Sequence, residues 1–466
     1  MFTNLLLPLR NVVRNRRRTL VTLITLVVGE IALLIFGGYA AAVVNGVQTG
    51  VVRQAGHLQV QRKNYFLVGT GAPEEFGIAD YRQLMQTIGD DPVLQPMLRV
   101  VTPLLQVQGI AGNFGAGITR TVVGNGYVPR EQNLMRHWNE YDFPDNPKDV
   151  PIPEGEAEVL SVGIGVARSL RLCTALAVPG CTDIAVAERA GDGAAMPGEL
   201  DALTADAAKT GQAAATAPGV RLDLLAASSS GAPNIVNARV AAAESLGVKA
   251  IDDSYLAMPL EMAQALVYGR QGTPQVTSVI LQLHRSGQIE DARARMNALI
   301  AQHGWDLEVL DYAALYPAFE QIKGLFGSIF GFVSMLIGVV VLFSVANTMS
   351  TAVLERTVEI GTLRSMGVRR SGITRQFLSE GMLIGVIGTG IGCVLALACA
   401  WAINAAGLTW TPPNSIDEIP LVVHVFNSPE LVFGSVLGLL ALAGLSSVLP
   451  AWRASGIPVV EALRHV

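Results

Sequence analysis

The segment Glu355–Gly367 is charged and compatible with a helix, and it stands between two long apolar runs. Ile360, Leu363 and the closing glycine recur at i, i+3 and i+7, which is the spacing of one helical face. Arg356 and Glu359 are three residues apart, as ion-paired neighbours on a helix are. An apolar stripe beside a charged pair favours docking and ion pairing over catalysis. The pattern predicts a short polar helix that joins two apolar segments.

Such a helix at a membrane surface can receive a push from a soluble partner and pass it to the two helices that it joins. The small residues of the segment would let a groove of the partner approach closely. The alternative is an ordinary interfacial helix that lies on lipid headgroups. The expected docking residues are Glu355, Arg356, Glu359, Ile360, Gly361, Leu363, Arg364 and Gly367.

Motifs for catalysis are missing from these 466 residues. The sequence contains no G-x-x-x-x-G-K-[ST] phosphate loop, no H-E-x-x-H and no G-x-S-x-G. The six histidines are scattered, and the neighbouring acids Asp90–Asp91 and Asp252–Asp253 are of a kind common in turns. We therefore expect no catalytic residue, no metal site and no cofactor bound by this chain itself.

The composition indicates membrane helices. Half of the residues are hydrophobic and only 15% are charged, whereas about a quarter are charged in a typical soluble domain. Four apolar runs, at 19–45, 324–350, 377–406 and 431–452, are long enough to cross a bilayer. No block of like charge or basic-aromatic patch points to nucleic acid.

The arginines predict the orientation. Five of them precede the first run and five lie in residues 351–376, whereas residues 407–430 contain no Lys or Arg. The positive-inside rule then places residues 1–18, 351–376 and 453–466 in the cytoplasm. Residues 46–323 and the short loop 407–430 then lie on the other side of the membrane. We therefore expect a multi-pass protein of the bacterial inner membrane, with these two regions in the periplasm.

The large external region predicts an α+β domain with two subdomains. Its two ends, 46–110 and 276–320, each have the strand, helix and strand pattern of a β-α-β unit. Residues 111–275 form an inserted subdomain, in which 158–172 is expected to be helical and 173–220 is rich in Ala, Gly and Thr. Cys173 and Cys181 could form one local disulfide there, because the periplasm is oxidising.

Glu30 is a charged residue near the middle of the first apolar run. A charge at that depth costs roughly 2.5–3.5 kcal/mol, so it must be protonated, paired or in a polar cavity. A hydrogen bond to another helix, for instance to Ser344 or Asn347, is one interpretation. A role in a transport path or in proton-linked gating is the other. In the third run, glycines four apart favour close helix packing, either within the bundle or across a dimer.

Three stretches together are similar to the FtsX-like (MacB-type) permease superfamily of ABC transporters, which includes macrolide-exporter and lipoprotein-releasing permeases. The first is the arginine-rich entry at 9–20. The second is 355–367, which resembles the signature E-R-x-x-E-I-G-x-L-R-x-x-G. The third is the closing P-A-x-x-A-x…P-x-x-A-L-R pattern, at 450–464. The likeness covers the four-run layout and both ends of the chain.

The resemblance implies a permease subunit that works by mechanotransmission with two copies of a separate ATPase subunit, which would bind ATP and Mg²⁺. It also implies a second permease, identical or paralogous, and a lipoprotein, lipid or small amphiphile as cargo, handed to a periplasmic carrier or adaptor. The alternatives are a non-transporting relay that activates a periplasmic partner, and a membrane-anchored receptor without an ATPase. Cargo would enter along the first two runs, past Leu33, Ile35, Phe36, Phe326, Phe330 and Val333.

Overall fold

The computed structural model describes residues 16–145, 147–184, 219–228, 231–411 and 418–464. They separate into two compact units, each described by itself below. One unit comprises residues 1–48, 318–410 and 420–466, and we call it the helical unit. The other comprises residues 49–317 with 411–419, and we call it the α+β unit. The predicted class, four apolar helices with an α+β region, is confirmed.

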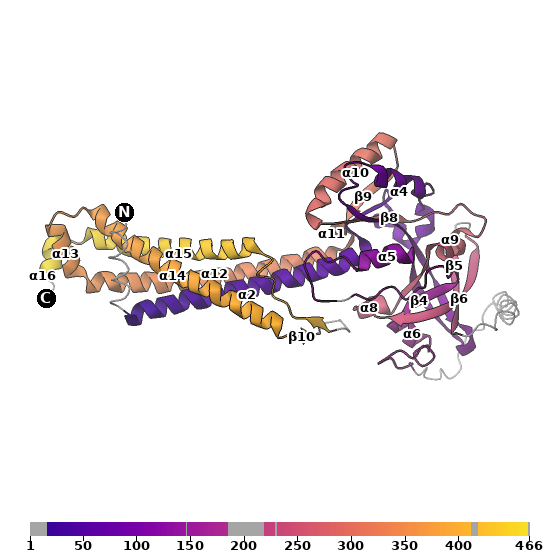
Figure 1. Ribbon diagram of the computed structural model, residues 1–466, viewed down its shortest axis with the longest axis horizontal. Helices are drawn as coiled ribbons and strands as arrows, with labels where there is room; N and C mark the ends of the chain where they lie inside the picture. Colours follow the sequence, from indigo (N-terminus) through magenta and orange to yellow (C-terminus); the bar gives the residue numbers. More distant parts are fainter. Residues whose placement is uncertain (1–15, 146, 185–218, 229–230, 412–417, 465–466) are drawn as a thin grey trace. The chain divides into compact units, whose positions relative to one another are not determined.

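Four long helices carry the predicted apolar runs (Figure 1). They are α2 (Arg16–Ala55), α12 (Pro317–Glu355), α14 (Arg370–Ala405) and α15 (Pro429–Gly456). Both α2 and α12 extend several residues past the predicted limits of 45 and 324. Helix α12 is preceded by a break at Tyr316, which has φ −123° and ψ 76°, because the residue before a proline is disfavoured in helical geometry.

Glycines of α14 allow close packing inside the helical unit. A Cβ added at Gly381 would lie 1.9 Å from Ser447 Oγ of α15. A Cβ at Gly388 would lie 2.7 Å from the Leu26 Cβ of α2. The two glycine pairs of this helix therefore face different neighbours, and both serve packing within the bundle. The core that they help to form consists of Leu26, Leu33, Val341, Val345, Met349, Ile384 and Leu439.

The α+β unit is built on one nine-stranded sheet in the order β3-β7-β4-β6-β5-β2-β8-β1-β9. An additional β2–β3 pairing closes six of the strands into a ring. The strands are β1 (Leu58–Arg62), β2 (Leu98–Asn113), β3 (Ile118–Tyr127), β4 (Val159–Gly163), β5 (Arg221–Ala227), β6 (Pro233–Glu244), β7 (Tyr255–Pro259), β8 (Ser278–Leu283) and β9 (Leu307–Asp311). The 16 residues of β2 are long enough to belong to both the ring and the open part of the sheet.

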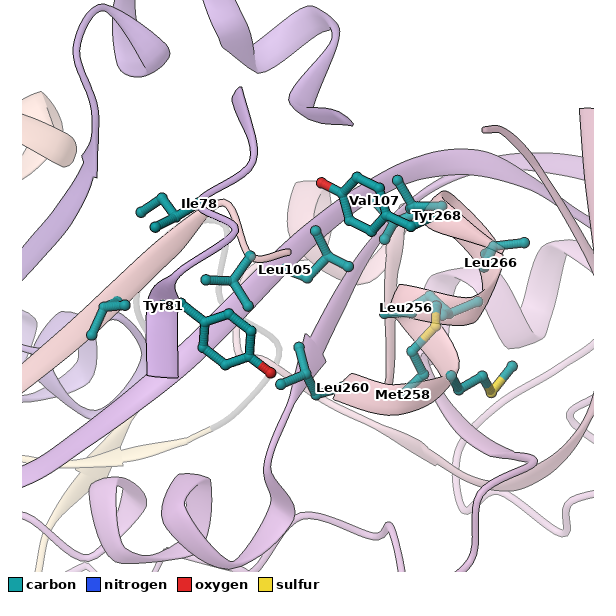
Figure 2. Packing of buried hydrophobic residues seen from close by; sticks show 14 of the residues in the cluster. Ile78, Tyr81, Leu105, Val107, Leu256, Met258, Leu260, Leu266 and Tyr268 are labelled. Carbon is teal, nitrogen blue, oxygen red and sulfur yellow. The ribbon is translucent and has the colours of Figure 1, made fainter. Parts of the chain in front are cut away.

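Helices pack against both faces of this sheet. They include α4 (Tyr81–Asp90), α5 (Pro129–Arg136), α6 (Ile164–Ser169), α8 (Lys249–Asp252), α9 (Leu260–Tyr268) and α10 (Ile289–His303), with the short α3 (Tyr65–Val68) and α11 (Tyr312–Leu315). Tyr81 of α4 and Leu266 of α9 pack into one continuous core with Leu105 and Leu256 of the strands (Figure 2). The expected helix at 158–172 is wrong in its first part, because all five residues of β4 are buried in the sheet. The division of this unit into two subdomains stays a prediction.

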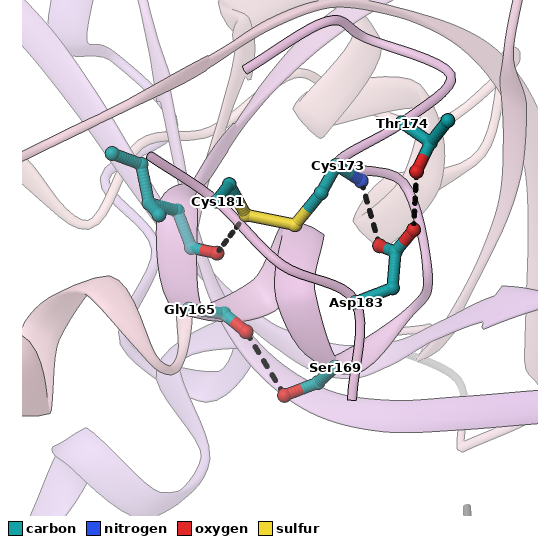
Figure 3. Close-up of a disulfide and its surroundings, with 7 residues drawn as sticks. Gly165, Ser169, Cys173, Thr174, Cys181 and Asp183 are labelled. Atoms are coloured by element: carbon teal, nitrogen blue, oxygen red, sulfur yellow. Dashed lines mark hydrogen bonds between the residues drawn. A yellow bond between two sulfur atoms is a disulfide. The ribbon is translucent and has the colours of Figure 1, made fainter. Parts of the chain in front are cut away.

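Cys173 and Cys181 are joined by a disulfide in the loop that follows α6 (Figure 3). Asp183 supports the loop: its carboxylate accepts hydrogen bonds from the Cys173 N–H and from the Thr174 hydroxyl, both at 2.9 Å. The Thr174 hydrogen bond lowers the pKa of Asp183. The loop is thereby fixed just ahead of residues 185–218, the greater part of the Ala-rich stretch, which lie outside the described residues.

His57 fixes the start of β1 from inside the α+β unit. The Leu283 N–H donates to its Nδ1 at 3.0 Å, so the proton of the neutral ring sits on Nε2, which faces Ser286 Oγ at 3.3 Å. The Trp138 ring packs edge-on, with centroids 5.0 Å apart. Burial lowers the pKa of His57 to about 3, because desolvation disfavours the charged ring.

We expect the stability of this unit to fall with acidification between pH 6.5 and about 3. In that window the unfolded state binds a proton that the folded state excludes, so the free energy of unfolding drops by up to about 1.4 kcal/mol per pH unit. Denaturant unfolding of the full chain across this range checks it. His57→Asn should flatten the dependence, and an equally steep slope in that variant would contradict the assignment.

Candidate functional site

The polar segment forms a short helix between two long ones. Helix α12 ends at Glu355, and α13 (Thr357–Ser365) follows after a single residue. Gly367, at φ +93°, then turns the chain. The Val368 N–H donates to the Leu363 carbonyl and the Gly367 N–H to the Arg364 carbonyl, each at 3.1 Å. This is the hydrogen-bond pattern of a helix end that requires a left-handed residue, which explains the glycine.

A buried ion pair holds the junction between α12 and α13. Arg356 NH1 lies 3.1 Å and 3.4 Å from the two carboxylate oxygens of Glu380. The exposed fractions of the two side chains are 7% and 6%. Sequence spacing suggested Glu359 as the partner of Arg356 and missed Glu380, which lies 24 residues further on in α14. The ion pair ties the start of the short helix directly to a long one.

The apolar stripe of α13 packs against its own bundle. Ile360 is 3% exposed, and Leu363 packs beside it. Their neighbours come from three long helices: Val353, Ile373, Phe377, Ala451 and Ala454. The Arg364 guanidinium also donates to the Ile457 carbonyl, just before α16 (Val459–Arg464). Contacts on three sides therefore make α13 part of the bundle, rather than a free loop.

The structure divides the expected docking residues by exposure. Arg356, Ile360 and Gly361 are buried within the chain, and Leu363 and Arg364 are half-buried. Only Glu355, Glu359 and Gly367 are exposed. The exposed residues that the prediction omitted include Val358, Thr362 and Met366. Their strict four-residue spacing is the sequence signal that could have revealed a second stripe.

The residues expected along the cargo entry are mostly packed between α2 and α12. The Phe36 and Phe330 rings stack with centroids 6.4 Å apart, and Phe326 meets Tyr39 edge-on at 6.3 Å. Ile35 and Val333 are half-buried. Leu33 lies in the bundle core at 6% exposure, and its place at a cargo entry stays a prediction.

Glu30 is fully buried in the helical unit, and Ser435 of α15 donates a hydrogen bond to its Oε1 at 2.8 Å. Its Oε2 has no hydrogen-bond partner among the described residues. A hydrogen bond to another helix was expected, but the suggested partners were wrong, since the Ser344 hydroxyl faces Thr25 at 3.3 Å. Glu30 faces α15, and the sequence alone does not show which neighbouring helix a buried residue faces.

Among the described residues, no group of three or more His, Cys, Asp or Glu side chains is placed to hold a metal ion.

Comparison with known proteins places this site in a recognised domain. Residues 329–459, which include α13 and the Arg356–Glu380 pair, match the FtsX-like permease C-terminal domain. These residues of the chain therefore form an FtsX-like permease C-terminal domain. The match contains the greater part of α12 and all of α14 and α15, so α13 lies inside the matched domain.

The relatives that this chain matches differ in their named cargo. The chain is 28% identical over 213 residues to the macrolide export ATP-binding/permease protein MacB of Hyphomonas neptunium, covering 45% of this chain and 30% of that protein. It is 26% identical over 201 residues to the lipoprotein-releasing system transmembrane protein LolC of Xylella fastidiosa, covering 41% and 47%. It is 27% identical over 214 residues to the pyoverdine export protein PvdT of Pseudomonas putida, covering 45% and 30%. The matches thus span less than half the length of each relative.

Breaking the Arg356–Glu380 pair should destabilise the helical unit. Arg356→Met or Glu380→Leu alone leaves a buried charge without its partner, which costs about 3–5 kcal/mol. The double variant should recover most of that loss, because a well-packed apolar pair replaces both charges. Unfolding of the detergent-solubilised chain measures the three free energies.

The exposed pair Lys323–Glu320, 3.5 Å apart, supplies the control. Glu320→Leu should change the free energy of unfolding by less than about 1 kcal/mol. Equal effects of Glu320→Leu and Glu380→Leu, or a double variant as unstable as the sum of its singles, would contradict a structural role for the buried pair.

Proposed function

We propose that this chain is the permease subunit of an ATP-binding-cassette complex that works by mechanotransmission. Two copies of a separate ATPase subunit would bind ATP and Mg²⁺ and contact α13, and a second permease, identical or paralogous, would complete the particle. The single observation that carries the proposal is the arrangement of α13, which is fixed to the bundle on one face and exposed on the other. A push on its outer face would therefore move the long helices.

The outer face of α13 has the composition of a docking surface. Val358 is 46% exposed and Met366 is 68% exposed, and the acids Glu355 and Glu359 border them. Exposed apolar residues within a polar rim are typical of protein–protein contacts. The buried residues Ile360 and Arg356 would set the position of this face without touching the partner.

The orientation proposed for the chain puts α13 in the cytoplasm and the α+β unit in the periplasm, at the bacterial inner membrane. The arginine distribution supports it. The Cys173–Cys181 disulfide supports it independently, since disulfides persist in oxidising compartments such as the periplasm.

The proposed cargo is a lipoprotein or another lipid-like amphiphile that is extracted or released on the periplasmic side, and a periplasmic carrier or adaptor would receive it. Support comes from the named cargo of the lipoprotein-releasing relative and from the half-exposed aromatic residues Phe36 and Phe330 between α2 and α12. Aromatic side chains at such a seam offer a large apolar surface for acyl chains.

Charges placed on the outer face of α13 should abolish ATPase capture without unfolding the chain. For Val358→Asp and Met366→Asp, we expect the affinity for a co-expressed ATP-binding-cassette ATPase subunit to fall at least roughly tenfold, as at an interface hot spot. Affinity purification followed by quantitation of the bound ATPase measures this loss.

The matched control is Val248→Asp, which introduces the same charge at a valine that is 42% exposed in the α+β unit. It should leave capture unchanged. Undiminished capture by Val358→Asp and Met366→Asp would contradict the docking assignment.

For the cargo, the reconstituted complex should release a labelled lipoprotein from vesicles when ATP is added. ATP hydrolysis without release of the lipoprotein would favour a pure relay.

A further inference from the structure

The α+β unit contains a cavity of about 270 Å³ whose walls are rich in side-chain amides. The amides come from five different places in the chain, and none of them is part of the helical unit. They are Gln54, Gln59, Gln61, Gln106, Asn125 and Gln132. Complete small-molecule sites usually measure about 300–1,000 Å³, so this cavity suits a small ligand or one polar part of a larger molecule.

Strand alternation explains how these amides come together. Leu58 and Val60 of β1 are fully buried in the core that α4 and α10 cover. Gln59 and Gln61 alternate with them and therefore project from the opposite face of the sheet. Gln106 of β2 and Asn125 of β3 are direct partners in the strand register, so they lie side by side.

Several of these amides are held in place by one hydrogen bond each. Gln59 Nε2 donates to the Ala55 carbonyl at 3.0 Å, and Gln106 Oε1 accepts from the Tyr65 hydroxyl at 2.7 Å. Gln132 Nε2 donates to the Arg53 carbonyl at 3.4 Å. Each amide keeps its other end for a further hydrogen bond, and anchoring reduces the entropy lost when a ligand binds.

The cavity is electrically neutral. Its one cationic lining residue, Arg136, pairs with Glu244 at 2.9 Å. The Tyr127 hydroxyl is buried, and the Tyr255 hydroxyl, which also belongs to the lining, lies next to it. An ionic ligand would find no countercharge here. An uncharged group with hydrogen-bond donors and acceptors could instead form hydrogen bonds with the polar side chains that line the cavity.

We propose that this cavity binds the uncharged peptide segment next to the lipid part of the cargo, a further step that rests on the proposed function. Planar side-chain amides match the paired donor and acceptor of peptide groups. The rings of Tyr65 and Tyr127 are 6% and 3% exposed, and the ring of Tyr316 is 40% exposed, so a sugar that stacks on Tyr316 is the competing ligand that the test must exclude. The cavity also touches the last turn of α2 at Gln54, and Tyr316, directly before α12, so its occupant contacts both connections to the helical unit.

The test uses the full chain in nanodiscs and a fluorescent lipopeptide, a dipalmitoylated cysteine followed by Ser-Gly-Asn-Ser. Fluorescence anisotropy gives its dissociation constant. Asn125→Leu should weaken binding roughly three- to tenfold, the effect of losing one or two hydrogen bonds. The control Asn297→Leu, on the exposed side of α10, should not change it. Thermal unfolding of each variant shows that the chain still folds.

Three results would overturn the proposal: equal affinity of wild type and a folded Asn125→Leu, binding of a tetralysine lipopeptide with the same sensitivity to Asn125→Leu, or equal competition by an unlabelled diglucosyl diacylglycerol. Absence of lipopeptide binding by the wild-type chain would overturn it as well. Capture of the ATPase subunit by the same preparations tests the proposed function separately. If the chain still captures the ATPase but gives any of these results, only the cavity assignment is rejected.

Discussion

The buried ion pair between Arg356 and Glu380 is the constraint on which the rest of the helical unit depends. Two charges with exposed fractions below a tenth are costly to bury and are tolerated only when they meet. Their meeting fixes the junction where α12 ends and α13 begins against the first turns of α14. The direction of α13 follows from this contact together with the packing of Ile360 against Phe377 and Ala451.

A short helix held in this way has two distinct faces with different tasks. The inner face is covered by the chain's own long helices, and the outer face, with Val358 and Met366, is exposed. Interiors are close-packed and transmit displacement with little compression, so under the proposed function a force applied to the outer face would be shared by α12, α14 and α15. The close approaches of Gly381 and Gly388 continue this packing along α14.

Sequence patterns were sufficient for the class of fold and for the four apolar helices, because run length and composition determine both. They were insufficient wherever a contact joins distant residues. Arg356 has a plausible local partner in Glu359, and nothing in the sequence points to Glu380. The stripe containing Ile360 was correctly attributed to one helical face, but periodicity does not show whether a partner or the chain itself covers that face. The misassigned start of 158–172 has a similar cause, since Val159 and Leu160 fit a buried strand and a buried helix equally well.

The central claim is that α13 and the long helices move as one body. Spin labels at Thr362→Cys on α13 and Trp452→Cys on α15, in a chain whose Cys393 and Cys399 are replaced by serine, allow the distance within one chain to be measured by pulsed EPR. The account predicts one narrow distance distribution that stays the same when the ATPase-bound complex receives a non-hydrolysable ATP analogue. A broad distribution, or a shift of several ångströms on nucleotide binding, would show that α13 moves independently and would contradict it.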